Sequence, residues 1–175
     1  MRRALARIWS SRRGTALTEF AIILPVVIFM FAGIIEFGRI FQVYAALNRL
    51  ATQYSIAWAD CSDDPAGTCD TELGEYTSSY TIANFAPQLN AGSLTLTMFQ
   101  VQMSGSTPTV VYAYPSGATL TAAQTSAASS TFASGQTGVI VTASYTHSLI
   151  FFNQLMTPLL GGVLNPTYTV VQLKS

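Results

Sequence analysis

Charged side chains are scarce in this chain of 175 residues, where Asp, Glu, Lys and Arg together make up only 9%. Soluble domains usually carry about a quarter. From residue 76 to residue 173 there is no charged side chain at all. This long stretch therefore offers no basic surface for nucleic acid and no carboxylate of its own for acid–base catalysis.

Histidine is nearly absent too, because His147 is the only one. Every carboxylate side chain precedes residue 76, so we expect an ordinary surface or core histidine, no catalytic residue and no enzyme. A membrane-tethered enzyme that folds distant carboxylates towards His147 is the least favoured alternative. The acidic cluster at residues 60–75 lacks the spacing of a calcium loop, so we expect a solvated turn, no metal site and no cofactor.

Only two cysteines are present, Cys61 and Cys69. Neither belongs to a C-x-x-C pair or has a histidine nearby, which argues against zinc. A disulfide between them in an oxidising compartment is the favoured interpretation, and a reduced pair is the alternative.

The longest apolar run covers residues 16–35, with Thr18 and Glu19 as its clearly polar members. As a helix it reaches about 30 Å, enough to cross the hydrocarbon layer. A cleaved secretory signal is shorter and ends at an Ala-x-Ala site, which is missing here. Pro25 predicts a kink that membrane helices tolerate. Five arginines precede Glu19 and predict a cytoplasmic amino terminus: Arg2, Arg3, Arg7, Arg12 and Arg13.

Helical periodicity continues beyond the apolar run. Glu36 and Arg39 stand three residues apart, so they share a helix face and predict an ion pair near the outer boundary. Large apolar residues then recur every three or four positions and predict one long helix to about Trp58: Phe37, Ile40, Tyr44, Leu47, Leu50, Tyr54 and Trp58. Such a helix is about twice the bilayer thickness, so its outer half must pack on the soluble domain or on neighbouring subunits.

The remainder predicts a small α+β domain, with a short helix that ends near Pro87 and an antiparallel sheet. Alternating residues predict strands at 93–103, 109–114, 138–145 and 168–173, with a bulge near Met98 where the alternation changes phase. The expected organisation is a basic leader (1–14), a transmembrane and amphipathic helix (15–58) and an exported α+β domain (59–175). Because these strands lack charge, their edges favour joining other subunits.

Two segments of this domain are ambiguous. Residues 119–132 are rich in Ser, Thr and Ala and predict either a mobile loop or a weak helix, too polar for the core. Residues 149–160 are strongly apolar but are interrupted by Asn153, Gln154 and Pro158, so they are too broken for a second span. Folded core is favoured there over an exposed contact patch.

The junction between the arginines and the apolar run resembles the processing site of type IV prepilins. In that site a membrane peptidase cuts after a glycine, and a glutamate stands at the fifth mature position. The resemblance implies cleavage after Gly14, with Thr15 as the first mature residue and Glu19 as the fifth. Phe20 after Glu19 resembles the Flp branch. The alternative is that Glu19 only supplies a negative charge at a helix amino terminus.

Residues 13–58 resemble the TadE family of minor pilins or pseudopilins of the tight-adherence system. The resemblance rests on Glu19-Phe20-Ala21, Leu24-Pro25 and the stretch from Gly33 to Arg39. It implies a structural subunit of a type IV (Tad/Flp) pilus or a related secretion machine, in the bacterial inner membrane with its domain periplasmic or in a filament. Implied partners are prepilin peptidase, other pilin subunits and an inner-membrane assembly platform. An unprocessed bitopic anchor or binding protein is the alternative.

Overall fold

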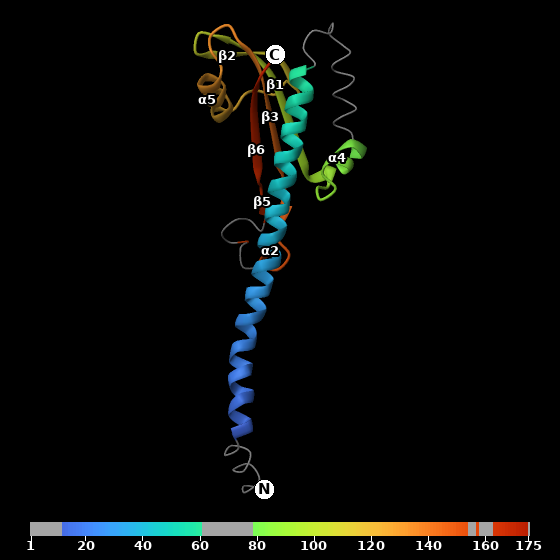
Figure 1. The fold of residues 1–175 in the computed structure, drawn as a ribbon, viewed down its shortest axis with the longest axis vertical. Helices are drawn as coiled ribbons and strands as arrows, with labels where there is room; N and C mark the ends of the chain where they lie inside the picture. Colours follow the sequence, from blue (N-terminus) through green and yellow to red (C-terminus); the bar gives the residue numbers. More distant parts are fainter. Residues whose placement is uncertain (1–11, 61–78, 154–156, 158–162, 175) are drawn as a thin grey trace. The chain divides into compact units, whose positions relative to one another are not determined.

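The computed structural model describes residues 12–60, 79–153, 157 and 163–174 (Figure 1). The chain divides into two compact units, Met1–Arg39 and Ile40–Ser175, and helix α2 (Arg12–Asp60) contributes to both. We call Ile40–Ser175 the domain and residues 16–35 the apolar segment. Several residues singled out in the sequence lie outside the described residues: Arg2, Arg3, Arg7, Cys61 and Cys69.

The first unit is described as the amino-terminal part of α2, which continues without interruption through Pro25. A proline inside a helix removes one backbone hydrogen bond, a defect that membrane helices tolerate. Large apolar side chains are exposed along the whole apolar segment, from Leu17 at 72% to Ile35 at 50%. This part of the helix therefore presents apolar surface in every direction.

Within the domain, α2 becomes a core helix. Its buried side chains recur every three or four residues: Val43, Ala46, Leu47, Leu50, Ala51, Tyr54 and Trp58. The periodicity correctly predicted Leu47, Leu50, Tyr54 and Trp58. Tyr44 and Phe37 do not belong to this face, because both are exposed; small alanines occupy the buried face instead, where they allow close approach to the sheet.

Four antiparallel strands form the sheet, in the order β2-β1-β3-β6 (Figure 1). They are β1 (Leu94–Ser104), β2 (Thr107–Tyr114), β3 (Thr137–Tyr145) and β6 (Thr167–Leu173). The four strands expected from alternation are thus confirmed, with shifts of at most two residues at their ends. The α+β class with a long amino-terminal helix and an antiparallel sheet is confirmed as well.

The predicted bulge near Met98 is wrong, because the pairing of β1 with β3 continues in one register from Leu94 to Gln102. Met98 packs in the cluster of α2, whereas Phe99 packs on the other face of the sheet. The alternation of apolar residues in β1 therefore changes phase because its large buried side chains pass from the face that α2 covers to the opposite face of the sheet. The irregularity in the sheet lies in β2, where Val111 is the extra residue between Val110 and Tyr112.

Helix α5 (Ala122–Thr131) covers part of that second face, so the helical alternative for residues 119–132 is confirmed. Thr121 caps the helix in a capping box with Gln124, which satisfies backbone groups that the first turn leaves open. The expectation that this segment is too polar for the core is wrong. Ala128 and Phe132 are buried against Phe99, and small residues let the helix lie close to the sheet.

Short elements complete the domain: α4 (Ser79–Phe85), which ends before Pro87 as predicted, η1 (Ala91–Ser93), β4 (His147–Ser148) and β5 (Val163–Leu164). β4 and β5 pair as a separate two-stranded ribbon. The expectation of folded core for residues 149–160 holds for Leu149 but is wrong for Ile150 and Phe151, which are 59% and 53% exposed. Short-range hydrophobicity does not reveal which side of a turn faces outwards.

Burial of Tyr54 makes domain stability depend on pH. The pKa of the Tyr54 phenol is raised from 10.0 to about 12. Burial is the larger cause, and electrostatic repulsion from Tyr114 is the smaller one. The unfolded chain loses this proton first, so the contribution of Tyr54 is complete below pH 10 and is lost as the pH rises towards 12. We expect the free energy of unfolding to fall by up to about 1.4 kcal/mol per pH unit in this window.

Urea unfolding at pH 9 to 12 measures this slope for the wild type and for Tyr54→Phe, which lacks the ionisable group. Tyr44→Phe, at an exposed tyrosine of the same helix, is the matched control. A Tyr54→Phe chain that loses stability between pH 10 and 12 as steeply as the wild type contradicts the assignment.

Candidate functional site

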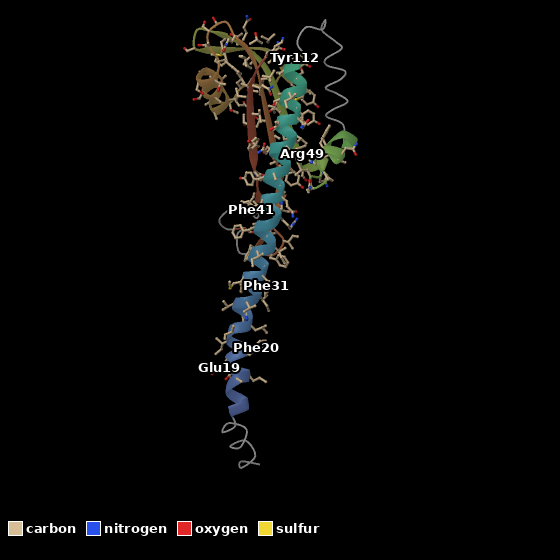
Figure 2. All side chains as sticks on the ribbon, viewed as in Figure 1. Glu19, Phe20, Phe31, Phe41, Arg49 and Tyr112 are labelled. Atoms are coloured by element: carbon tan, nitrogen blue, oxygen red, sulfur yellow. The ribbon has the colours of Figure 1, made fainter. Side chains whose placement is uncertain are left out.

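The predicted processing residues lie at the amino-terminal end of α2. Gly14 and Thr15 belong to the first turn of the helix, and Glu19 and Phe20 project from the next turns with exposed side chains (Figure 2). The first turn of a helix lacks half of its hydrogen bonds, and glycine lowers helix propensity by about 1 kcal/mol relative to alanine. The Gly14–Thr15 bond therefore lies in a part of α2 that unwinds at low cost.

Beyond Glu19 the surface of the helix is apolar on all sides, with Phe20 and Phe31 among its exposed aromatic residues (Figure 2). Among the described residues, one helical stretch, Ala16–Ala59, is long and apolar enough to cross a bilayer. Because α2 buries its side chains within the domain from Val43 onwards, the part of it that keeps the exposed apolar surface of a membrane span is residues 16–35. This arrangement fits a single-pass membrane protein.

A charged pair follows the apolar segment. Arg39 Nη1 lies 3.7 Å from Glu36 Oε1, at the helical spacing that the sequence predicted. Their burial is unequal, because the Glu36 side chain is 3% exposed and the Arg39 side chain 38% exposed. A buried carboxylate is costly unless a positive charge or hydrogen-bond donors compensate it. Arg39 supplies that charge, and the burial of Glu36 is the feature that spacing alone does not reveal.

On the second face of the sheet, beside α5, hydroxyl side chains line a groove of about 380 Å³. They form two rows across β1, β3 and β6: Thr97, Thr142 and Thr169 in one, and Thr95, Ser144 and Thr167 in the other. The rows are linked internally by hydrogen bonds, such as that of 2.9 Å between Thr142 and Thr169. Gln124 of α5 donates to Thr142 Oγ1 at 2.8 Å, which fixes the helix to the sheet.

No ionisable side chain lines this groove, so its chemistry is limited to neutral hydrogen bonds. Sequence reasoning did not identify it, although the alternation of Thr and Ser in three predicted strands contained the signal. Its position between α5 and the sheet depends on the strand order, which the sequence does not give.

His147 is a buried core residue, 4% exposed, with its ring centroid 6.4 Å from that of Tyr145. It borders a cavity of about 160 Å³ between the start of the domain and the β4–β5 ribbon. The other lining residues are apolar or neutral: Ile40, Tyr44, Leu164, Asn165 and Pro166. The described lining of this cavity contains no carboxylate.

Comparison with known protein families shows that residues 14–53 match the family described as TadE-like protein. The match begins at Gly14 and includes Glu19, Phe20, Glu36 and Arg39, so it contains the predicted processing residues, the apolar segment and the charged pair. No curated protein and no solved structure matches the chain.

Proposed function

We propose that this chain, a Tad pilus-associated protein by its TadE-like segment at residues 14–53, is a minor pilin or pseudopilin. In this proposal prepilin peptidase cuts after Gly14, and α2 holds the mature subunit in the inner membrane until an assembly platform takes it up. The amino terminus is cytoplasmic and the domain is exported. The protein acts as a structural subunit and not as an enzyme.

The observation that carries the proposal is the exposed apolar surface of α2 within the family match. From Leu17 to Ile35 the large apolar side chains are exposed, and no element of the described structure covers them. Such a surface needs lipid around it, or the helices of other subunits. A pilin meets both needs in turn, first in the membrane and then in a filament.

Glu19 supports the assembly role. A carboxylate in an apolar helix costs about 2.5–3.5 kcal/mol near the bilayer centre and less near its edge. Cleavage after Gly14 creates a positively charged amine on Thr15. The amine of a neighbouring subunit neutralises Glu19 once the helices pack together, so the pair favours assembled subunits over isolated ones.

The mature amino terminus tests the processing step. We expect intact mass and terminal sequencing of protein from native membranes to show a chain that starts at Thr15. Gly14→Leu should retain the leader, because a bulky side chain prevents close approach to the cleavage site. Gly33→Ala is the matched control, since an added Cβ at Gly33 meets nothing within 4 Å.

Glu19→Ala separates cleavage from assembly. It should still be cleaved, but its amount in sheared filaments or in complexes with other subunits should fall at least about tenfold, the effect of losing roughly 1.4 kcal/mol. A wild-type leader that is retained while the machinery is expressed contradicts the proposal and leaves a bitopic anchor or binding protein.

A further inference from the structure

We propose that the groove between α5 and the sheet, called the hydroxyl groove below, binds a neutral mono- or disaccharide. The groove lies wholly within the domain, and its floor consists of the two rows of Thr and Ser side chains on β1, β3 and β6. The inference goes beyond the proposed function and does not depend on it, because it concerns only this surface of the domain.

Charge and size limit the ligand first. None of the described side chains that line the groove is ionisable, and the sequence has no Asp, Glu, Lys or Arg from residue 76 to residue 173. A charged ligand would lose water there without gaining a countercharge, which is costly. The volume of about 380 Å³ is near the lower end of small-molecule sites, which span about 300–1,000 Å³. The groove therefore suits a small neutral ligand.

The floor keeps hydrogen-bonding capacity for such a ligand. Thr142 and Thr169 share one hydrogen bond of 2.9 Å, and whichever oxygen donates it, one O–H of the pair has no acceptor among the described residues. Thr167 donates to Ser144 Oγ at 3.0 Å, so the Ser144 O–H remains as well. These oxygens also keep lone pairs. The floor thus presents groups that both donate and accept, as the hydroxyls of a sugar do.

The spacing of the hydroxyls favours a ligand that carries several of them. Neighbouring strands are about 4.8 Å apart, and the two rows lie two residues, or about 6.8 Å, apart along the strands. Backbone pairing holds this grid in place before any ligand arrives, so little ordering is needed on binding. A ring with several hydroxyls can meet more than one position of the grid at once.

The wall that α5 contributes complements the floor. Ala123 and Ala127 give it an apolar surface, and Phe99 lies where the hydroxyl rows give way to the buried cluster under α5. Saccharide rings combine apolar C–H faces with hydroxyl-bearing edges, so a ring can place a face on the alanines and an edge on the floor. A purely apolar ligand would instead leave the hydroxyls of the floor without partners.

The position of α5 also disfavours a second copy of the sheet as the occupant. Two sheets pack face to face over their whole width. Here α5 covers part of the same face, and the hydrogen bond from Gln124 to Thr142 Oγ1 fixes it there. A second sheet therefore cannot lie flat on the hydroxyl rows, whereas a small ligand fits beside the helix.

Methyl NMR of the full chain tests the inference, because the groove is lined by Thr and Ala residues whose methyl groups report binding at each position. The labelled chain, in a zwitterionic detergent without a sugar headgroup, is titrated with maltose and with N,N′-diacetylchitobiose. We expect saturable shifts at Thr97, Thr169 and Ala123. Thr109 should not shift, since it is exposed on β2 and pairs with Gln102, whose side chain lies on the other face of the sheet.

Two variants locate the binding. Thr169→Val keeps the shape of the side chain but removes its hydroxyl, and it should weaken sugar binding about fivefold, the worth of one neutral hydrogen bond. Thr109→Val is the matched control and should bind as the wild type does. Ala123→Leu narrows the groove and should abolish the saturable shifts. Unchanged signals of Ala46 and Ala51, which are buried against α2's side of the sheet, show that each variant folds.

The wild-type titration decides the matter even if a variant fails to fold. Absence of saturable shifts with both sugars overturns the inference, and so do equal shifts with glycerol at the same hydroxyl concentration, which would show unspecific contact with polyols. Equal affinities of Thr169→Val and Thr109→Val also overturn it. Shifts in the groove that follow protein concentration and not sugar identify a second copy as the occupant and refute the saccharide.

Discussion

Leu50→Ala is expected to lower the free energy of unfolding of the domain by about 2–5 kcal/mol, the range measured when a fully buried leucine is truncated. Leu50 is completely buried where α2 packs on the sheet, in the cluster that also contains Met98 and Val141. The strands of the sheet are held by backbone hydrogen bonds, so the sheet closes little of the cavity that the lost atoms leave.

Urea unfolding of the detergent-solubilised chain, followed by the near-ultraviolet signal of its aromatic residues, Trp58 among them, measures this loss. Ile56→Ala is the matched control on the same helix, because Ile56 is 50% exposed and should lose less than about 1 kcal/mol. Equal losses for the two variants would show that α2 is not a core element of the domain.

Gly138→Ala is the second change with a large expected effect. A Cβ at Gly138 of β3 would overlap Cζ, Cε1 and Cε2 of Phe132, whose ring packs directly on the glycine backbone. Phe132 is 4% exposed and is confined by Phe99 and Ile140, so the ring has little room to move. Overpacking of this kind costs about 1–3 kcal/mol.

A double-mutant cycle identifies the cause. Phe132→Leu alone should destabilise the domain because it removes buried apolar area, yet Gly138→Ala should cost much less in that background. Unfolding measured by circular dichroism provides the four free energies. Additive effects would contradict the steric explanation, since they would mean that Gly138→Ala acts independently of the Phe132 ring.

Much of the fold follows from the sequence, and the reasons differ from element to element. Alternation located β1, β2, β3 and β6 because a strand with one covered face repeats every two residues. The same rule failed at Met98 and Phe99, where both side chains are buried on opposite faces. Periodicity shows that one face of a strand is covered, but it does not show which helix or loop covers that face.

The weakest predictions concern small or neutral residues. Helix α5 buries Gln124 and Ala128, and neither residue is strongly hydrophobic. The sequence therefore does not predict that α5 belongs to the core until the sheet order is known. Glu36 presented the opposite problem. Its pairing with Arg39 followed from spacing, whereas its burial, with only 3% of the side chain exposed, did not.

For the candidate site, the sequence predicted the local motif but not the surfaces. Gly14, Glu19 and Phe20 lie within seven positions of the sequence, so their pattern can be recognised without a structure, and the family match covers them. The exposure of Ile150 and Phe151 and the two hydroxyl rows depend on which strands lie side by side. Those pairings join residues far apart in the chain, and no local pattern encodes them.

The bulge at Val111 makes the two edges of the sheet unequal, and this limits how copies can join through their sheets. A bulge interrupts the regular spacing of backbone groups that a new strand requires, so β2 is a poor edge, while β6 keeps an unbroken register with β3. Joining through one edge alone is self-complementary and closes as a two-fold pair. Open-ended growth of the sheet from copy to copy needs two different competent edges, and the irregular β2 edge disfavours it.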